Sequence, residues 1–532
     1  MKTKNIIYSS LICICSALAT SSCVGDLDQV PQVETTSETV YTTLEGFEAV
    51  MGKIYNSMTT TGQGRGGDNA DLSSISGHDY MRCYWNMQEC GTDEVASTWL
   101  AGDKTADLTY LTWDSNDPWV SDMYYRIYYN ITLCNEFLRN CTVDKVAELG
   151  GELRRYRAEA RTMRAMFYLH ALDLYRNIPF VDETSETGSF IPPCYTPAQT
   201  FAFIEKELKE AAADLHGKAE CPYGRMPKGG ALTLLARLYL NSETWTGTPR
   251  YAECADACRQ VVAEGYTLES DYKKLFNADN HLRTNEIIFA LQVDPDKTVS
   301  WGSSTYLVCG EVASTGTTQK PEDYGVTSGW GMFRARGELP ELWIASMPNP
   351  ADDSRYQFHT AGQTQYIDNI AGQDQSQGYC VKKWTNLKDD GTQASNTADD
   401  GVATDYPLMR LADVYLMYAE AVVRGGGDRV TALGYLNALR QRAYGANYSA
   451  TNGALADADM TADLILDERA RELYWEGYRR SDMVRYGRFT AGKNFQWRGG
   501  SKSGSVVDKR YNYYPIPSTE LTANPNLSNP EY

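Results

Sequence analysis

The sequence predicts a mainly α-helical protein, built from tetratricopeptide-like helix pairs and interrupted by long irregular inserts. Apolar residues recur at three- and four-residue steps over most of the chain, and sustained strand-type alternation is almost absent. Several helical stretches also follow one another in pairs and run into glycine. Because the consensus tryptophan, leucine and glycine signature of such repeats is absent, this prediction depends on the helix-pair spacing alone.

The chain begins with a predicted secretory signal followed by a lipid attachment site. Two lysines precede an apolar run from Ile6 to Leu18, which is too short and too interrupted to span a bilayer. Small side chains then lead to Cys23 in a pattern that resembles a bacterial lipobox, although Thr20 stands where leucine is commoner. We therefore expect residues 1–22 to be removed and Cys23 to carry a lipid that tethers the chain without crossing the membrane. The alternative is a conventional secretory cut that leaves Cys23 incidental.

After a polar tether at residues 23–37, residues 38–532 are expected to form a single domain. In "TPAQTFAFIEKELKEAAADL", Thr196 can cap a helix, Pro197 fits its first turn, and Gln199 stands three residues after the cap. "YAECADACRQVVAEG" ends at Gly265, because glycine readily takes the left-handed conformation that closes a helix. The stretches "RLADVYLMYAEAVVRGGG" and "DRVTALGYLNALRQRAYG" repeat this arrangement further along the chain.

Two long inserts, at about 59–117 and 294–385, break the helical pattern. Both are rich in glycine, serine, threonine and aromatic residues, and both are long for connections in a compact domain. Such segments point to function or to mobility. Trp119, just after the first insert, recurs with apolar residues at helical spacing and is predicted to lie in the core.

The composition argues against several classes of partner and site. With 50 basic and 69 acidic side chains, the net charge of -19 would repel nucleic acid. Of the 13 cysteines, ten would remain in the exported domain, and their pairing stays open. The five histidines have no zinc-ligand spacing, and Cys254 and Cys258 lack a second cysteine pair. We therefore expect no metal site and no cofactor.

The enzyme motifs that are easily read from a sequence are missing. Neither a G-x-S-x-G elbow nor an H-E-x-x-H helix is present, and 69 acidic residues make any proposed glycosidase pair uninformative. Glu468, Glu472, Arg479 and Asp482 could be mistaken for catalytic acids and bases, but their helical setting favours ion pairs within the scaffold. The sequence thus removes two enzyme classes that are easily read from motifs.

The stretch "YRAEARTMRAMFYLHALDLYRNIPFV" resembles the hallmark helix of the SusD/RagB family. The blocks "GRMPKGGALTLLARLYL", "NEIIFALQ", "YPLMRLADVYLMYAEA", "LNALRQRAYG", "ILDERARELYWEGYRRSDMVRYGRF" and "YPIPSTELTANPNLSNP" are similar to family blocks in family order. The start, "CVGDLDQVPQ", is similar to a family lipoprotein N-terminus. The resemblance covers nearly the whole chain.

This resemblance implies a SusD-like α/α fold and a surface lipoprotein of the outer membrane of a Bacteroidetes-type bacterium. Such a protein binds glycan or another nutrient and works with a SusC-like TonB-dependent transporter, and no reaction is implied. We therefore expect a glycan-binding protein that uses the inserts as its ligand face and delivers its ligand to the transporter. The alternatives are a peptide or other nutrient-binding homologue, a helical-repeat adaptor, and a glycoside hydrolase.

Aromatic residues in the inserts are the candidates for sugar binding. Sugar recognition uses an aromatic face against the apolar side of the ring, with planar polar groups for its hydroxyls. For each insert tryptophan, packing in the core is as probable a role as ligand contact. The candidates for a shallow ligand platform are Arg82, Trp85 and Trp99 from the first insert, and Trp301, Tyr306 and Trp330 from the second.

Overall fold

The computed structural model describes residues 37–64, 69–72, 78–188, 190–298, 300–313, 318–372, 374–396 and 401–532. The predicted signal at residues 1–22, the lipid attachment site at Cys23 and nearly all of the tether lie outside the described residues. No helix in the described part of the chain has both the length and the apolar character needed to cross a membrane.

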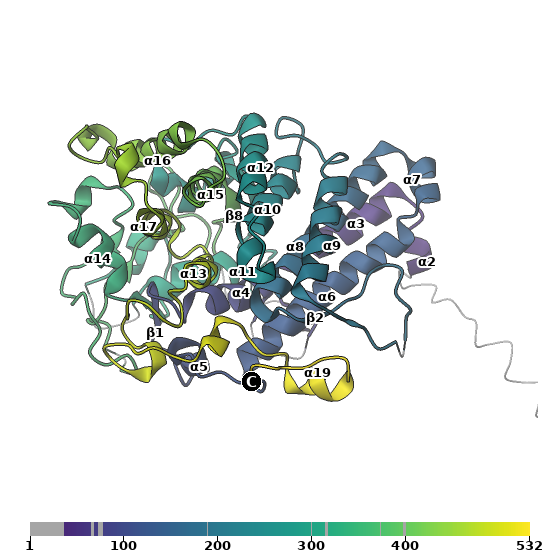
Figure 1. Ribbon diagram of the computed structural model, residues 1–532, viewed down its shortest axis with the longest axis horizontal. Coiled ribbons are helices and arrows are strands. Elements are labelled where there is room, and N and C mark those ends of the chain that lie inside the picture. Colours follow the sequence, from purple (N-terminus) through teal and green to yellow (C-terminus); the bar gives the residue numbers. More distant parts are fainter. Residues whose placement is uncertain are drawn as a thin grey trace, which may run out of the picture.

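The N-terminal third is a group of long helices that pack around α8 (Gly151–Tyr175). Both α3 (Leu44–Asn56) and α6 (Pro118–Asn140) pack against α8, on the right in Figure 1. Asp117 caps α6 by accepting hydrogen bonds from the backbone of its first turn, which begins with a proline. Trp119 on this turn is fully buried, so its predicted place in the core is confirmed.

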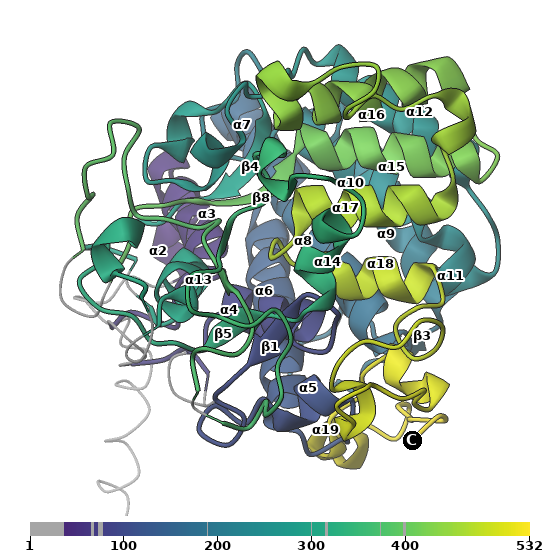
Figure 2. The ribbon, with the colours of Figure 1, turned by 90° about the vertical axis from the view of Figure 1, so that its left-hand side faces the viewer.

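Helix pairs then stack one upon another across the molecule. The helix α9 packs on α8, α10 on α9, α12 on α10, α15 on α12, and both α16 and α17 on α15. Figure 2 shows α16, α15, α17 and α18 as successive layers. The bounds are α9 (Pro197–Ala211), α10 (Lys228–Leu240), α12 (Tyr251–Ala263), α15 (Leu411–Val423), α16 (Arg429–Tyr444), α17 (Ala462–Leu473) and α18 (Arg479–Arg485).

The predicted start of α9 and the predicted end of α12 are both found in this stack. The Thr196 and Gln199 side chains form the reciprocal capping box at the start of α9. Gly265, after the end of α12, has φ +86°, the left-handed conformation that glycine adopts without a steric penalty. The mainly helical class with paired helices is therefore confirmed.

The inserts contain more regular structure than the sequence predicted. They hold short helices, and their strands form two-stranded antiparallel sheets, β1 with β5 and β6 with β7. Outside them, β2 pairs with β3, and β4 pairs with β8 beneath the helix stack. The strands are β1 (Val95–Ser97), β2 (Ile178–Pro179), β3 (Cys194–Tyr195), β4 (Ile287–Leu291), β5 (Phe333–Ala335), β6 (Phe358–His359), β7 (Cys380–Val381) and β8 (Tyr406–Arg410).

Short helices complete the described chain. The α-helices are α2 (Ser37–Val40), α4 (Tyr80–Glu89), α5 (Ala106–Tyr110), α7 (Val143–Leu149), α11 (Ser242–Thr246), α13 (Ser303–Glu311), α14 (Glu338–Ile344) and α19 (Ser518–Ala523). The 3-10 helices are η2 (Tyr272–Phe276), η3 (Asn280–Leu282), η4 (Pro321–Tyr324), η5 (Pro350–Asp352), η7 (Gly445–Asn447), η8 (Asp457–Asp459), η9 (Arg498–Gly500) and η10 (Lys509–Asn512).

A network of buried ion pairs ties α17 and α18 to their neighbours. Glu468 pairs with Arg355 at 3.2 Å, and Glu472 pairs with Arg410 at 2.6 Å. Buried charges of this kind depend on their partners, because an unpaired charge in the interior is costly. The predicted scaffold role of these acidic side chains is therefore confirmed. The corresponding pairs of α18 are Arg479 with Asp93 and Asp482 with Arg469, both at 2.7 Å.

The ten cysteines of the described residues are all free thiols. Cys254 and Cys258 are buried on α12, where each packs as a small apolar side chain. The open question of disulfide pairing is thus answered for this part of the chain, and the domain is held by its core and its ion pairs.

Candidate functional site

The pairing of β1 with β5 brings the two inserts together. Val95 lies opposite Ala335 and Ser97 opposite Phe333. Beyond the strand, the amide of Thr98 donates to the carbonyl oxygen of Met332 at 2.8 Å. Trp99 follows Thr98, and Trp330 precedes Met332 by two residues. The first insert therefore delivers Trp99 beside the segment that carries Trp330.

The helix α13 connects this segment to Trp301. Trp301 stands just before the N-terminus of α13, whose nine residues span about 14 Å. At the other end of α13, the amide of Trp330 donates to the carbonyl oxygen of Cys309 at 2.8 Å. The backbones of Trp301 and Trp330 are thereby fixed at the two ends of one short helix. We call Trp99, Trp301 and Trp330 together the tryptophan face.

Arg82, on α4, holds two parts of this face in place. Its Nη1 donates to the carbonyl oxygen of Trp301 at 2.7 Å, and its Nη2 donates to the carboxylate of Asp103 at 2.6 Å. The amide of Asp103 in turn donates to the carbonyl oxygen of Trp99 at 2.9 Å. The guanidinium also lies 4.2 Å from the ring centroid of Tyr306. Arg82 is itself only 6% exposed, so it positions the loops.

A carboxylate at the start of α4 fixes the loop before α13. Asp79 caps α4 by accepting the Arg82 amide at 2.7 Å, and its other oxygen accepts the Ser300 hydroxyl at 2.6 Å. A Cβ atom on Gly302 would lie 2.2 Å from this carboxylate, so only glycine fits there without displacing it. Trp301 therefore stands between two anchored residues.

The six predicted ligand residues fall into two layers. Trp99 and Trp301 are each 38% exposed, and Trp330 is half-buried. Trp85 and Tyr306 are 1% and 0% exposed, because the facing sides of α4 and α13 pack them against each other with centroids 5.9 Å apart. These two rings do not reach the surface and instead form the layer beneath it, together with the positioning residue Arg82.

Sequence reasoning missed the polar residues that order these loops. Asp79, Asp103 and Ser300 were not among the candidates. The stretch "HDYM" carries a recognisable signal, since an aspartate before an apolar helical run is a typical N-cap. The role of Asp103 has no local signal, because its partner Arg82 lies on another element.

A buried group of possible metal ligands lies beneath the same loops. His78, Cys83 and Asp122 hold ligand-type atoms within 4.8 Å of one another. The Nδ1 of His78 is 3.0 Å from the Asp122 carboxylate, and its ring stacks on Trp119 with centroids 3.8 Å apart. Burial raises the pKa of the Cys83 thiol well above its ordinary value, which disfavours the thiolate that binds metal. Arg126 adds a positive charge by donating to the His78 carbonyl at 2.8 Å, so the group fits a hydrogen-bonded core better than a cation.

Asp103 lies between the buried His78 group and Arg82, which holds the tryptophan face, and its pKa is shifted by both neighbours. Burial by itself would raise the pKa of its carboxyl, but the His78 ring, whose Nε2 lies 3.7 Å from the carboxylate, and the charge of Arg82 outweigh burial. The pKa of Asp103 therefore lies below its ordinary value, and the carboxylate stays ionised as the partner of Arg82. The platform is thus braced by a permanent charge pair.

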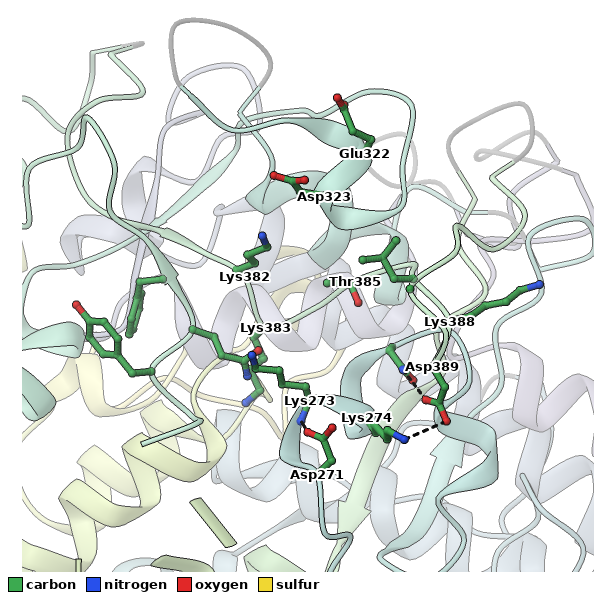
Figure 3. A pocket seen from close by; sticks show the side chains of 16 residues that line it. Asp271, Lys273, Lys274, Glu322, Asp323, Lys382, Lys383, Thr385, Lys388 and Asp389 are labelled. Atoms are coloured by element: carbon green, nitrogen blue, oxygen red, sulfur yellow. Dashed lines mark hydrogen bonds and ion pairs between the residues drawn. The ribbon is translucent and has the colours of Figure 1, made fainter. Parts of the chain in front are cut away.

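A second hollow lies at η2, η4 and β6 and is shown in Figure 3. It has a volume of about 670 Å³ and shares no residue with the tryptophan face. Lysines, acidic residues and two aromatic rings line it, and we call it the lysine cleft. Its lining residues are Asp271, Lys273, Lys274, Asn277, Glu322, Asp323, Tyr356, Gln357, Phe358, Lys382, Lys383, Thr385, Leu387, Lys388, Asp389 and Gly391.

The fold and the first of these sites together define a class: a helix-pair scaffold whose inserts present exposed aromatic side chains. Comparison with known proteins identifies the family. The chain belongs to the SusD family, because it is 32% identical over 582 aligned residues to the starch-binding protein SusD of Bacteroides thetaiotaomicron, with 100% of both chains covered. The family model described as "SusD family" matches residues 343–532.

Other relatives agree with this assignment. The SusD-like protein P25 of Formosa agariphila is 24% identical, with 99% of this chain and 98% of that protein covered. The crystal structure of a SusD homolog from Bacteroides thetaiotaomicron has the same fold, with a TM-score of 0.71 at 18% identity over 94% of this chain and 99% of that one. Surface glycan-binding protein A from Bacteroides thetaiotaomicron, in complex with laminarihexaose, gives a TM-score of 0.68 at 17% identity over 92% of this chain and 100% of that one.

Proposed function

We propose that this protein is a cell-surface glycan-binding lipoprotein that captures oligo- or polysaccharide and delivers it to a SusC-like TonB-dependent transporter. It binds without catalysis, and the tryptophan face is its ligand platform. The observation that carries the proposal is a pair of tryptophans, Trp99 and Trp301, that stay 38% exposed although their backbones are anchored from beneath.

Exposed indole rings on a rigid support suit the recognition of sugars. A ring that is already fixed loses little conformational entropy when a ligand stacks on it. Stacking and a few hydrogen bonds give moderate, reversible affinity without burying charge, which suits a protein that must pass its cargo on. Trp330, half-buried beside Trp99, extends the same surface.

The first ligand to test is an α-glucan of the starch type. The relative that is 32% identical over the full chain is a starch-binding protein, and it is the strongest sequence match among those described above. Laminari-oligosaccharide is the second candidate, because a structural neighbour was solved with laminarihexaose. At 17% identity that neighbour supports the fold alone, so laminari-oligosaccharide ranks below starch as a candidate ligand.

Delivery to a transporter and the lipid anchor complete the proposal. Family membership supports a SusC-like partner, and the lipobox-like sequence at Cys23 supports attachment to the outer membrane. Copurification from detergent-solubilised outer membranes tests the partner. Recovery of the protein without any β-barrel transporter would contradict that part of the proposal.

Calorimetric titration with maltoheptaose, laminarihexaose, other plant and host glycans, and peptides tests the ligand class. Trp99→Ala and Trp301→Ala should each weaken glycan binding about fivefold or more, since stacking on each ring contributes on the order of 1 kcal/mol or more. Phe190→Ala is the matched control, because Phe190 is 36% exposed on the segment between β2 and β3.

Three outcomes would replace the proposal with one of the alternatives. Binding of peptides alone would identify a peptide-binding homologue. Binding of a protein partner without any carbohydrate affinity would identify a helical-repeat adaptor. Release of shorter sugars from incubated glycans, followed by chromatography, would identify a hydrolase.

A further inference from the structure

The lysine cleft has the size of a ligand site. Its volume of about 670 Å³ falls within the roughly 300–1,000 Å³ of small-molecule sites. Segments distant in the sequence form its walls: η2, η4, β6, and the chain from 382 to 391. These segments are fixed by hydrogen bonds, such as that from the Asn386 amide to the Tyr324 carbonyl at 2.7 Å. The cleft is therefore a preformed feature, formed where the second insert meets η2 and the chain that follows the insert.

Three of its five lysines, Lys273, Lys382 and Lys388, form no ion pair with another described residue. Lys274 pairs with Asp389 at 3.6 Å, and the buried Lys383 pairs with Glu476 at 2.7 Å. Within the described part of the chain, no carboxylate lies within 4.0 Å of the ammonium groups of Lys273 or Lys382. Figure 3 shows Lys382 between η4 and the lysines of η2, with Lys388 at one side. In a chain of net charge -19, this is a local concentration of unpaired positive charge.

An acidic pair limits the charge that the cleft can accept. Glu322 and Asp323 on η4 are exposed, and neither forms an ion pair with another described residue. Figure 3 shows them on the opposite side of Lys382 from Lys273. They would repel a second negative charge on the same ligand, because like charges close together are unfavourable. The cleft therefore favours a ligand with one anionic group over a polyanion.

Aromatic rings beside the lysines add a surface for an apolar ring face. Tyr356 and Phe358 are half-buried in the wall, with centroids 5.0 Å apart. Phe358 is backed by Tyr474, whose ring lies nearly parallel to it at 5.9 Å. The side chains of Gln357 and Thr385 offer hydrogen bonds to hydroxyl groups. Ammonium groups and aromatic rings in one cleft match the two ends of an acidic sugar.

We propose that the lysine cleft binds a sugar that carries a single carboxylate or sulfate group. Lys273 and Lys382 hold the anionic oxygens by charge-assisted hydrogen bonds. Tyr356 and Phe358 contact the apolar face of the ring. This second site acts apart from the tryptophan face, so its test does not depend on the function proposed for that face.

The experiment titrates the full mature chain with three matched sugars: sialyllactose, singly sulfated lactose, and lactose. At least one of the two anionic sugars should bind with measurable heat, and lactose should bind more weakly at this cleft. Which anionic sugar binds tells carboxylate from sulfate. The double variant K273Q/K382Q should weaken the binding of that sugar by about tenfold or more, since one hydrogen bond to a charged group is worth about that factor.

Two further variants should change the affinity for the anionic sugar in opposite directions. E322Q/D323N removes the repelling pair and should tighten binding of the anionic sugar, whereas Tyr356→Ala should weaken it. Lys206→Gln is the matched control, because Lys206 on α9 is 65% exposed and distant in the helix stack. It removes one positive charge, where the double lysine variant removes two, and should leave binding unchanged.

Four results would overturn the proposal. Neither anionic sugar binds; binding is insensitive to K273Q/K382Q; K206Q weakens it equally; or inorganic sulfate binds as tightly as the sulfated sugar. Trp301→Ala should not affect this binding, so loss of the signal in that variant would assign the sugar to the tryptophan face instead. Circular dichroism of each variant confirms that it is folded.

Discussion

Arg82 donates from Nη1 to the carbonyl oxygen of Trp301 at 2.7 Å, across 219 residues of sequence. The same guanidinium donates to Asp103, whose amide is bonded to the backbone of Trp99. One buried cation thus fixes the backbone of two exposed indoles. Because the support is in place before any ligand arrives, the ordering cost of binding is reduced.

Replacing Arg82 with lysine should weaken glycan binding about tenfold while leaving the protein folded. A lysine has one ammonium group and cannot reproduce the planar fork that reaches the Trp301 carbonyl and Asp103 together. The measurement is calorimetric titration with the best glycan ligand, alongside the melting temperature. Arg259→Lys is the control, since Arg259 is exposed on α12 and pairs at the surface with Asp256. An unchanged affinity in Arg82→Lys would show that the brace does not matter for binding.

Gly302→Ala should displace Trp301 and weaken glycan binding several-fold. The added Cβ atom would lie 2.2 Å from the Asp79 carboxylate, which caps α4 and holds Ser300. The control is Gly52→Ala within α3, where an added Cβ atom meets no atom within 4 Å. That substitution should stabilise the protein by about 0.5–1 kcal/mol, because alanine favours helix. Equal affinities in both variants would contradict the role assigned to the loop.

Local signals in the sequence predicted the helices, whereas the site depended on long-range contacts. The capping box at Thr196 and the buried Trp119 follow from spacing within one turn, so both were predictable. Trp85 and Trp99 look alike as insert tryptophans, yet one is 1% and the other 38% exposed. The difference comes from packing between α4 and α13, which no pattern along the chain encodes.

The lysine cleft was missed for the same reason. Lys273 and Lys382 lie 109 positions apart in the numbering (382 − 273) and meet only because η2 and the chain after β7 form facing walls. Lysines are common on any surface, so neither residue stands out in the sequence. The pairing of β1 with β5, which assembles the tryptophan face, is likewise a contact between two inserts that each look irregular on their own.

Reducing agents should leave the stability of the protein unchanged. The cysteines from Cys83 to Cys380 in the described residues are free, and most of them are buried. Melting temperatures with and without dithiothreitol should therefore coincide. In denaturant, a thiol-specific reagent should titrate all ten of these groups. A lower melting temperature with dithiothreitol, or fewer reactive thiols, would reveal a disulfide.

Cys23→Ala should release the protein from the membrane fraction. The expected lipid on Cys23 would supply the anchor, since each buried methylene group contributes about 0.8 kcal/mol. Fractionation of cells and mass measurement of the mature N-terminus provide the test. Ser22→Ala is a suitable control, because alanine is also small and should still allow cleavage. Membrane partition that persists in Cys23→Ala, with no acyl mass on the wild-type chain, would refute the anchor.

The buried carboxyl of Glu468 should make the stability of the scaffold depend on pH. Burial tends to raise its pKa, but the charges of Arg355, Arg440 and Arg471 outweigh burial and lower the pKa from its ordinary 4.5 to about 2. A group whose pKa is lower in the folded state stabilises the protein above its unfolded pKa. This stabilisation is lost as the pH is lowered from about 4.5 to about 2.

Glu468→Gln should therefore destabilise the protein by about 3 kcal/mol at pH 7, and by roughly half as much at pH 3. Glutamine resembles the protonated acid. The difference in the free energy of unfolding between variant and wild type therefore becomes smaller at low pH, where the wild-type carboxyl is protonated. Urea unfolding at the two pH values measures the difference. Glu148→Gln serves as the control, because Glu148 is 58% exposed in a surface pair with Lys145 and should change stability little at either pH. A Glu468→Gln deficit of the same size at pH 3 and pH 7 would mean that the lost free energy comes from packing and not from the charge that the three arginines stabilise.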